Sequence, residues 1–240
     1  MGVRAEAVVF DVDDTLYDLA EPYREAFAAC FAQRYDLPVD ELFVLSRDKS
    51  DVALELLTAG KITAEDHKVL RVQLTFAEFG VEVSREEALA FQDAYASAQE
   101  RITLYPEAIA MLDAVARSGV PCGVMSNGDA AHQQKKLDLL GLSRWVDDAH
   151  VVLSGDYGAN KPSPILYEAM ERKLGVAGDG VWYVGDTYET DVVGAKRAGW
   201  SCLWLDVRGR AVPAVAERPD ATVHSVEAMR AFVEELVMAS

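Results

Sequence analysis

Short apolar runs recur along the chain, and each of them ends in small or polar residues. The runs lie at residues 7–10, 120–125, 150–153, 181–184 and 202–205. Runs of this length, bounded by Gly, Ser and Asp, are typical of buried strands whose two faces are both covered. The pattern therefore predicts a parallel sheet rather than an exposed antiparallel one.

Helical periodicity fills the gaps between most of these runs. The segments 106–118, 129–140, 164–174 and 191–198 each end just before a glycine, which is the residue that most often follows a helix end. Strands that alternate with helices form right-handed βαβ units. We therefore expect an α/β fold with a doubly wound, Rossmann-like parallel sheet.

The stretch between the first two predicted strands has a different pattern. Helical periodicity covers residues 20–35, 52–57, 62–79 and 85–101, and no strand-like run interrupts it. Six aromatic residues at helical spacing are predicted to form its core: Phe27, Phe31, Phe76, Phe79, Phe91 and Tyr95. We expect residues 17–103 to be a helical insertion in an α/β core made of residues 1–16 and 104–240.

Composition narrows the classes of partner. The 240 residues include 23 Lys and Arg against 40 Asp and Glu, a net charge of −17. Such a chain lacks the basic surface that nucleic-acid polymers and anionic membranes require, so a small molecule is the expected partner. Three scattered cysteines, Cys30, Cys122 and Cys202, form no disulfide framework and favour a reducing cytoplasm. The sequence does not determine an oligomeric state.

Two acids follow the first predicted strand directly. Asp11 and Asp13 are two positions apart, so in extended chain their side chains point the same way. Two adjacent carboxylates repel unless they share a proton or bind a cation, and Mg²⁺ is the hard cation that such oxygens suit. A cluster of acids at a helix start is the ordinary alternative for this pattern.

Three later strand ends or loops also carry polar residues. Ser126 and Asn127 precede a predicted helix, where a hydroxyl and backbone N–H groups can bind phosphate. Lys161 follows a loop with two glycines, and Asp186 and Asp191 follow the fourth apolar run. Each alone is equally compatible with a turn, a helix cap or a solvated lysine. Their order along one sheet edge, where open α/β sheets bind ligands, favours a single active site.

At these residues the sequence resembles the haloacid dehalogenase-like hydrolase superfamily. Residues 11–15, Asp-Val-Asp-Asp-Thr, resemble its DxDxT motif, Ser126 its second motif and Lys161-Pro162 its third, and residues 185–191 match GDxxxxD. The helical insertion resembles the C1 cap of that superfamily. Within it, the chain is similar to the capped phosphatases, which include pyrimidine nucleotidases, N-acylneuraminate-9-phosphatases and phosphoglycolate phosphatases.

The resemblance implies a phosphatase with an aspartyl-phosphate intermediate. Asp11 would be the nucleophile, and Asp13 would protonate the leaving alcohol and later accept a proton from water. Ser126, Asn127 and Lys161 would bind the phosphoryl oxygens. The substrate would be a small phosphate ester, and the form of the first motif favours a nucleotide 5′-monophosphate among several open candidates.

The resemblance also implies the magnesium ligands. Mg²⁺ would be bound by the carboxylates of Asp11 and Asp186 and by the backbone carbonyl of Asp13. Asp191 would act directly or through water. A phosphate ester adds negative charge to an acidic pocket, so a divalent cation is needed to make binding favourable.

Other activities stay open on the same residues. A 2-haloacid dehalogenase uses the same nucleophile but needs no acid at position 13, while a phosphonatase uses a lysine of the cap, and Lys49, Lys61 and Lys68 lie there. A phosphomutase on the same fold is a further candidate. A receiver-like regulatory protein would explain neither the insertion nor the last acid pair. A non-catalytic protein on the same fold is a further alternative, although all the residues that the chemistry needs are present. Four further residues are possible substrate contacts, although each fits an ordinary surface or packing role: Tyr17, Arg24, Arg47 and Lys49.

Overall fold

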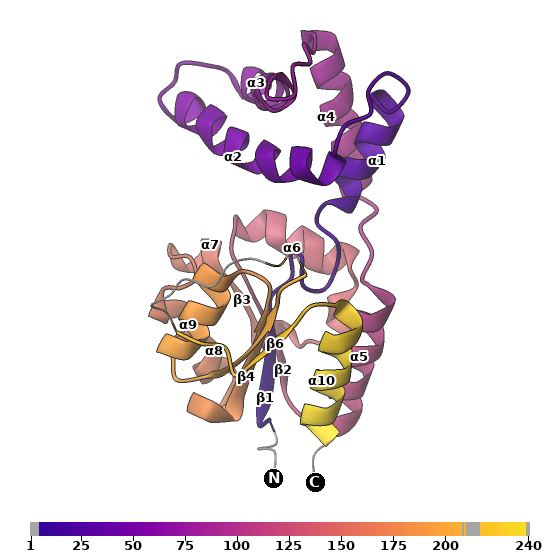
Figure 1. Cartoon of the computed structure of the whole chain (residues 1–240). Coiled ribbons are helices and arrows are strands. Elements are labelled where there is room, and N and C mark those ends of the chain that lie inside the picture. Colours follow the sequence, from indigo (N-terminus) through magenta and orange to yellow (C-terminus); the bar gives the residue numbers. More distant parts are fainter. Residues whose placement is uncertain (1–4, 208, 210–216, 239–240) are drawn as a thin grey trace. The chain divides into compact units, whose positions relative to one another are not determined.

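The computed structural model describes residues 5–207, 209 and 217–238. The chain forms two compact units, which Figure 1 shows in sequence colours. We call Met1–Asp18 with Thr103–Ser240 the core unit, and Leu19–Ile102 the helical unit.

The core unit contains a six-stranded sheet in the order β3-β2-β1-β4-β5-β6. The strands are β1 (Ala7–Phe10), β2 (Cys122–Ser126), β3 (Val151–Leu153), β4 (Val181–Gly185), β5 (Ser201–Leu205) and β6 (Ala221–Val223). Every neighbouring pair is parallel. The predicted α/β class with a doubly wound parallel sheet is therefore confirmed, and β6 is a strand that the sequence pattern did not indicate.

Helices pack on both sides of this sheet. They are α5 (Pro106–Ser118), α6 (Ala130–Leu139), α7 (Ser154–Tyr157), α8 (Pro164–Leu174), α9 (Val193–Arg197) and α10 (Val226–Met238). Figure 1 shows α5 and α10 on one side of the strands and α8 and α9 on the other. The glycine after α5, Gly119, has a φ of 72° in the left-handed region, which ends the helix at low steric cost.

Aromatic residues fill the core between the sheet and α8. Tyr167 on α8 lies with its ring centroid 5.2 Å from that of Trp200, and Tyr183 of β4 lies 6.3 Å from the same indole. Edge-to-face and tilted contacts of this kind are favoured over face-to-face stacking. Cys122 and Cys202 are buried free thiols, as the apolar runs around them predict.

The helical unit consists of α1 (Glu21–Cys30), α2 (Val39–Thr58), α3 (Ala64–Ala77) and α4 (Arg85–Gln99). Capping boxes begin α3 at Thr63 and α4 at Ser84, where a side-chain oxygen accepts the N3 backbone hydrogen. Four of the predicted aromatic core residues are buried, namely Phe27, Phe31, Phe76 and Phe91, while Phe79 and Tyr95 are half-buried and pack against them. Phe31 and Phe76 are the closest pair, at 4.6 Å. The pattern placed only residues 52–57 of α2 in a helix, because residues 39–51 mix polar and apolar positions. Over the described ranges, no helix combines the length and apolarity that crossing a membrane requires.

Candidate active site

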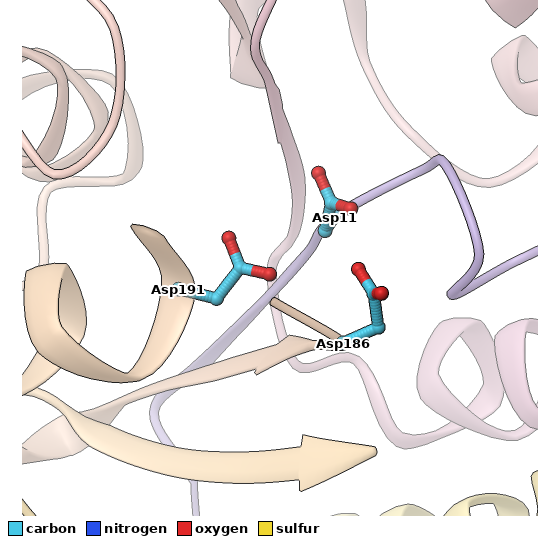
Figure 2. A group of neighbouring side chains, drawn as sticks. All are labelled: Asp11, Asp186 and Asp191. Carbon is cyan, nitrogen blue, oxygen red and sulfur yellow. The ribbon is translucent and has the colours of Figure 1, made fainter. Parts of the chain in front are cut away.

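The candidate site lies at the carboxyl ends of the central strands. Asp11 follows β1, and Asp186 follows β4, its parallel neighbour. The chain crosses from one half of the sheet to the other between these strands, which is where doubly wound sheets bind ligands. Oxygens of Asp11, Asp186 and Asp191 all lie within 4.8 Å of one another, and Figure 2 shows the three carboxylates turned toward a common space.

Asp191 reaches this group from a single π-helical turn, Tyr188–Val192. Its Oδ2 accepts the backbone N–H of Thr187 at 2.9 Å, and the side chain is fully buried. A Cβ at Gly185 would lie 2.6 Å from Cγ of Asp191, so only glycine leaves room for this carboxylate. The Gly-Asp pair at 185–186 thus has a steric reason as well as a chemical one.

Lys161 is the cation among these acids. Its Nζ donates to Oδ1 of Asp11 at 2.7 Å, to Oδ1 of Asp191 at 2.8 Å and to the hydroxyl of Tyr183 at 2.8 Å. The Tyr183 hydroxyl in turn donates to the carbonyl of Met125 at 3.1 Å. Burial lowers the pKa of Lys161, but the two carboxylates outweigh it and hold that pKa above its usual value.

The donor set fits a hard divalent cation. Burial raises the pKa of Asp11 well above its usual value, Lys161 opposes that rise, and Asp191 and Asp186 add to it by repulsion. One lysine is therefore too little positive charge for three buried carboxylates. Carboxylate oxygens at this spacing are the ligands that Mg²⁺ prefers, so the residues present suit that ion.

Ser126 is the last residue of β2 and Asn127 follows it, and their side chains differ in their hydrogen bonds. The Ser126 side chain is 1% exposed, and its hydroxyl makes no hydrogen bond to any described residue. The Asn127 side chain is engaged with Lys161, since its Oδ1 accepts the Lys161 backbone N–H at 2.7 Å and its Nδ2 donates to the Lys161 carbonyl at 3.3 Å. A phosphate contact by Asn127 stays a prediction, whereas its contacts with the Lys161 loop are part of the structure.

The carboxylate of Asp13 lies in a different environment. Lys136 of α6 donates to both of its oxygens at 2.8 Å, and the Tyr17 hydroxyl donates to Oδ1 at 2.6 Å. Its side chain is 25% exposed, whereas that of Asp11 is 8% exposed. Between Asp13 and Tyr17 the chain turns through Asp14, whose φ of 57° is in the left-handed region that aspartate tolerates better than most residues.

Sequence reasoning missed Lys136 and Tyr183. The signal for Lys136 is its position three residues after Gln133 and four before Leu140, both of which are buried. A lysine on the buried face of a helix needs a counter-charge, and Asp13 supplies it. No sequence signal marks Tyr183, because a tyrosine in a core strand is ordinary packing.

Three of the possible substrate contacts, Tyr17, Arg24 and Lys49, have side-chain partners within their own unit. Tyr17 contacts Asp13 as described, while Arg24 forms ion pairs with Asp40 at 2.7 Å and with Glu21 at 3.1 Å. Lys49 forms an ion pair with Glu78 at 2.5 Å. Arg24 and Lys49 therefore have ordinary surface partners within the helical unit.

Comparisons with known proteins agree with this geometry. The model of the haloacid dehalogenase-like hydrolases matches residues 5–199. A glyceraldehyde 3-phosphate phosphatase of Methanopyrus kandleri is 30% identical over 201 residues, which cover 81% of each protein. The haloacetate dehalogenase H-2 of a Moraxella strain is 25% identical over 228 residues, which cover 94% of this chain and 96% of the relative.

The fold has close counterparts among solved structures. A magnesium-bound hydrolase of this type from Bacillus subtilis shares it with a TM-score of 0.67 at 22% identity, covering 96% of this chain and 99% of that one. The family model alone spans most of the chain, from before β1 to the end of α9. This protein belongs to the haloacid dehalogenase-like hydrolases.

Proposed function

We propose that this enzyme is a magnesium-dependent phosphatase that hydrolyses small phosphate monoesters in the cytoplasm. The observation that carries the proposal is the contrast between two carboxylates of one motif. Asp11 is buried beside Lys161, while Asp13 is more exposed and is held by Lys136 and Tyr17. Carboxylates in unlike environments serve unlike roles, which suits one nucleophile and one acid-base group.

The proposed reaction has two steps. A carboxylate oxygen of Asp11 forms a bond to phosphorus while the ester P–O bond breaks, and Asp13 gives its proton to the leaving alkoxide. Water then attacks the aspartyl-phosphate at phosphorus and loses a proton to Asp13, which frees inorganic phosphate and restores the Asp11 carboxylate. Lys161 and the Ser126 hydroxyl bind phosphoryl oxygens, which places charge and hydrogen-bond donors where the transition state needs them.

Asp11, Asp186 and the backbone carbonyl of Asp13 would hold Mg²⁺, with Asp191 contributing directly or through water. The bound ion supplies positive charge that offsets the carboxylates and the incoming phosphate. The buried acid group with its single lysine supports this assignment.

We propose residues 1–16 and 104–240 as the catalytic core and 17–103 as the cap domain, and the two compact units support this division. A nucleotide 5′-monophosphate is the substrate that the first motif favours.

Metal removal tests the magnesium assignment. We expect EDTA to abolish hydrolysis of p-nitrophenyl phosphate and added Mg²⁺ to restore it. Mg²⁺ should also raise the free energy of unfolding, by about 2.7 kcal/mol at one hundred times its Kd. Asp186→Asn should remove that stabilisation because it removes one ligand. Full activity in EDTA would contradict the assignment.

Asp13→Ala separates a phosphatase from a dehalogenase. A halide leaves without a proton, whereas an alkoxide needs one, so the loss should depend on the leaving group. We expect kcat to fall about 100-fold or more for an alkyl phosphate and much less for p-nitrophenyl phosphate, whose phenolate leaves unaided. The measurement is kcat for both esters in wild type and variant, and equal losses would count against Asp13 as the acid.

Lys136→Met tests how Asp13 is held. Loss of the ammonium frees the Asp13 carboxylate to move, and a misplaced acid costs about 10- to 100-fold in kcat. KM should change little, because Lys136 is not expected to touch phosphate. Lys135→Met on the exposed face of α6 is the matched control and should behave like wild type. Wild-type kcat for Lys136→Met would remove Lys136 from the proposal.

A further inference from the structure

The helical unit contains a cavity of about 190 Å³ that the proposed reaction does not use. Its walls come from α1, α2, α3 and α4 and combine aromatic faces with polar and charged side chains. Pockets for drug-sized ligands are about 300–1,000 Å³, so this one suits a molecule of only a few heavy atoms. Its volume sets the size of a ligand, and its side chains set the chemistry.

Arg71 on α3 is the central polar group of this cavity. One guanidinium nitrogen donates to Oε1 of Gln92, and the Cζ atom lies 5.8 Å from the Tyr95 ring centroid. No carboxylate of the described residues forms an ion pair with it. Burial lowers the pKa of Arg71, as expected for a charge that has lost water without gaining an anion. The remaining N–H groups of the guanidinium therefore lack an acceptor in the described structure.

Most basic side chains of the helical unit differ from Arg71 in this respect. Five of them have carboxylate partners: Arg24, Arg34, Lys49, Arg85 and Arg101. Arg47 also lacks an ion pair among the described residues, and it lines the same cavity. Lys61 and Lys68 have none either, but they are exposed and do not line it. In a chain of net charge −17, two unpaired arginines at one small cavity indicate an anion site.

Neutral donors complete the site. Gln92 is 7% exposed, and its amide nitrogen has no partner among the residues described. The Ser50 hydroxyl likewise has none, and Asp51 adds the one negative charge to the lining. Two arginines against one aspartate leave a net charge of about +1, which matches a carboxylate better than a phosphate dianion. The guanidinium fork also matches the geometry of two carboxylate oxygens.

We propose that this cavity binds a small organic acid through its carboxylate. Arg71 is the anchor, Arg47 adds a second positive charge, and Gln92 and Ser50 donate hydrogen bonds. The Tyr23 ring, which is 3% exposed, is an apolar wall for the carbon part of the ligand. This site goes beyond the proposed hydrolysis, and its occupancy can be measured without turnover.

The test is a calorimetric titration of the full chain in EDTA with glycolate, a monocarboxylate, as the probe. We expect a Kd of about 1 mM for the wild type and binding at least about tenfold weaker for Arg71→Met. Arg34→Met removes an exposed arginine of the same unit and should bind like wild type. Arg47→Met, at an exposed position that tolerates substitution, should weaken binding even if Arg71→Met unfolds.

Glycolate binding that is absent from the wild type, or that both Arg71→Met and Arg47→Met leave unchanged, would overturn the proposal.

Discussion

Asp11→Asn should fold like wild type and lose at least about 1,000-fold in kcat, the order of loss seen when a nucleophile is removed. The neutral amide of asparagine is a far weaker nucleophile than the Asp11 carboxylate, so the covalent intermediate should not form. Because the substitution removes a buried charge and keeps the shape, the free energy of unfolding should not fall greatly. Steady-state kinetics with p-nitrophenyl phosphate and a urea unfolding curve measure the two effects.

The control for this variant is Asp14→Asn, which changes an acid of the same segment that the proposal gives no chemical role. It should retain turnover within about tenfold of wild type, since asparagine also tolerates a positive φ. An Asp11→Asn enzyme with kcat within a few-fold of wild type would mean that another residue attacks phosphorus.

Lys161→Met should have the largest effect on stability. Removal of one partner from a buried ion pair costs about 3–5 kcal/mol, because the remaining charges are left buried without compensation. Asp11 and Asp191 would both lose the ammonium that lies 2.7 and 2.8 Å from their oxygens. The measurement is the free energy of unfolding in urea, in EDTA so that metal does not mask the loss.

The loss in the free energy of unfolding of Lys161→Met should grow with pH. Lys161 opposes the rise in the pKa of Asp11, so without it that pKa rises further. A carboxyl whose folded-state pKa exceeds its unfolded value loses stabilisation as pH rises through the folded value. Lys173→Met, at an exposed lysine of α8, is the control and should cost no more than about 0.5–1 kcal/mol. A Lys161→Met loss under about 1 kcal/mol at every pH would contradict this ion-pair assignment.

The strongest sequence signals were those with a local physical cause. Residues 7–10, 106–118 and 164–174 coincide with β1, α5 and α8, because continuous apolar runs, proline starts and glycine ends act within a few residues. By contrast, β6 has only half-buried or exposed residues and follows a proline and an acid, so its pattern carries no strand signal. It forms a strand because it pairs with β5, which is a tertiary effect.

In the candidate site, too, some features could be predicted from the sequence, and others depend on contacts that only the fold makes. Sequence spacing predicted that Asp11, Asp186 and Asp191 gather at one sheet edge, since the carboxyl ends of parallel strands meet there. It did not predict that Lys136 pairs with Asp13, because the two are far apart in sequence and only the fold brings α6 to that carboxylate. The π-helical turn around Asp191 was also unpredictable, since the pattern at 191–198 indicates an ordinary helix.

A rapid-quench experiment with ³²P-labelled p-nitrophenyl phosphate tests the nucleophile most directly. The enzyme is mixed with substrate and Mg²⁺, stopped in acid within the first turnover, digested and mapped by mass spectrometry. The proposed reaction predicts labelled phosphate on the peptide that contains Asp11, appearing before inorganic phosphate and decaying at the rate of its release. Release of inorganic phosphate in the first turnover with no label on Asp11, or with label on another residue, would contradict it.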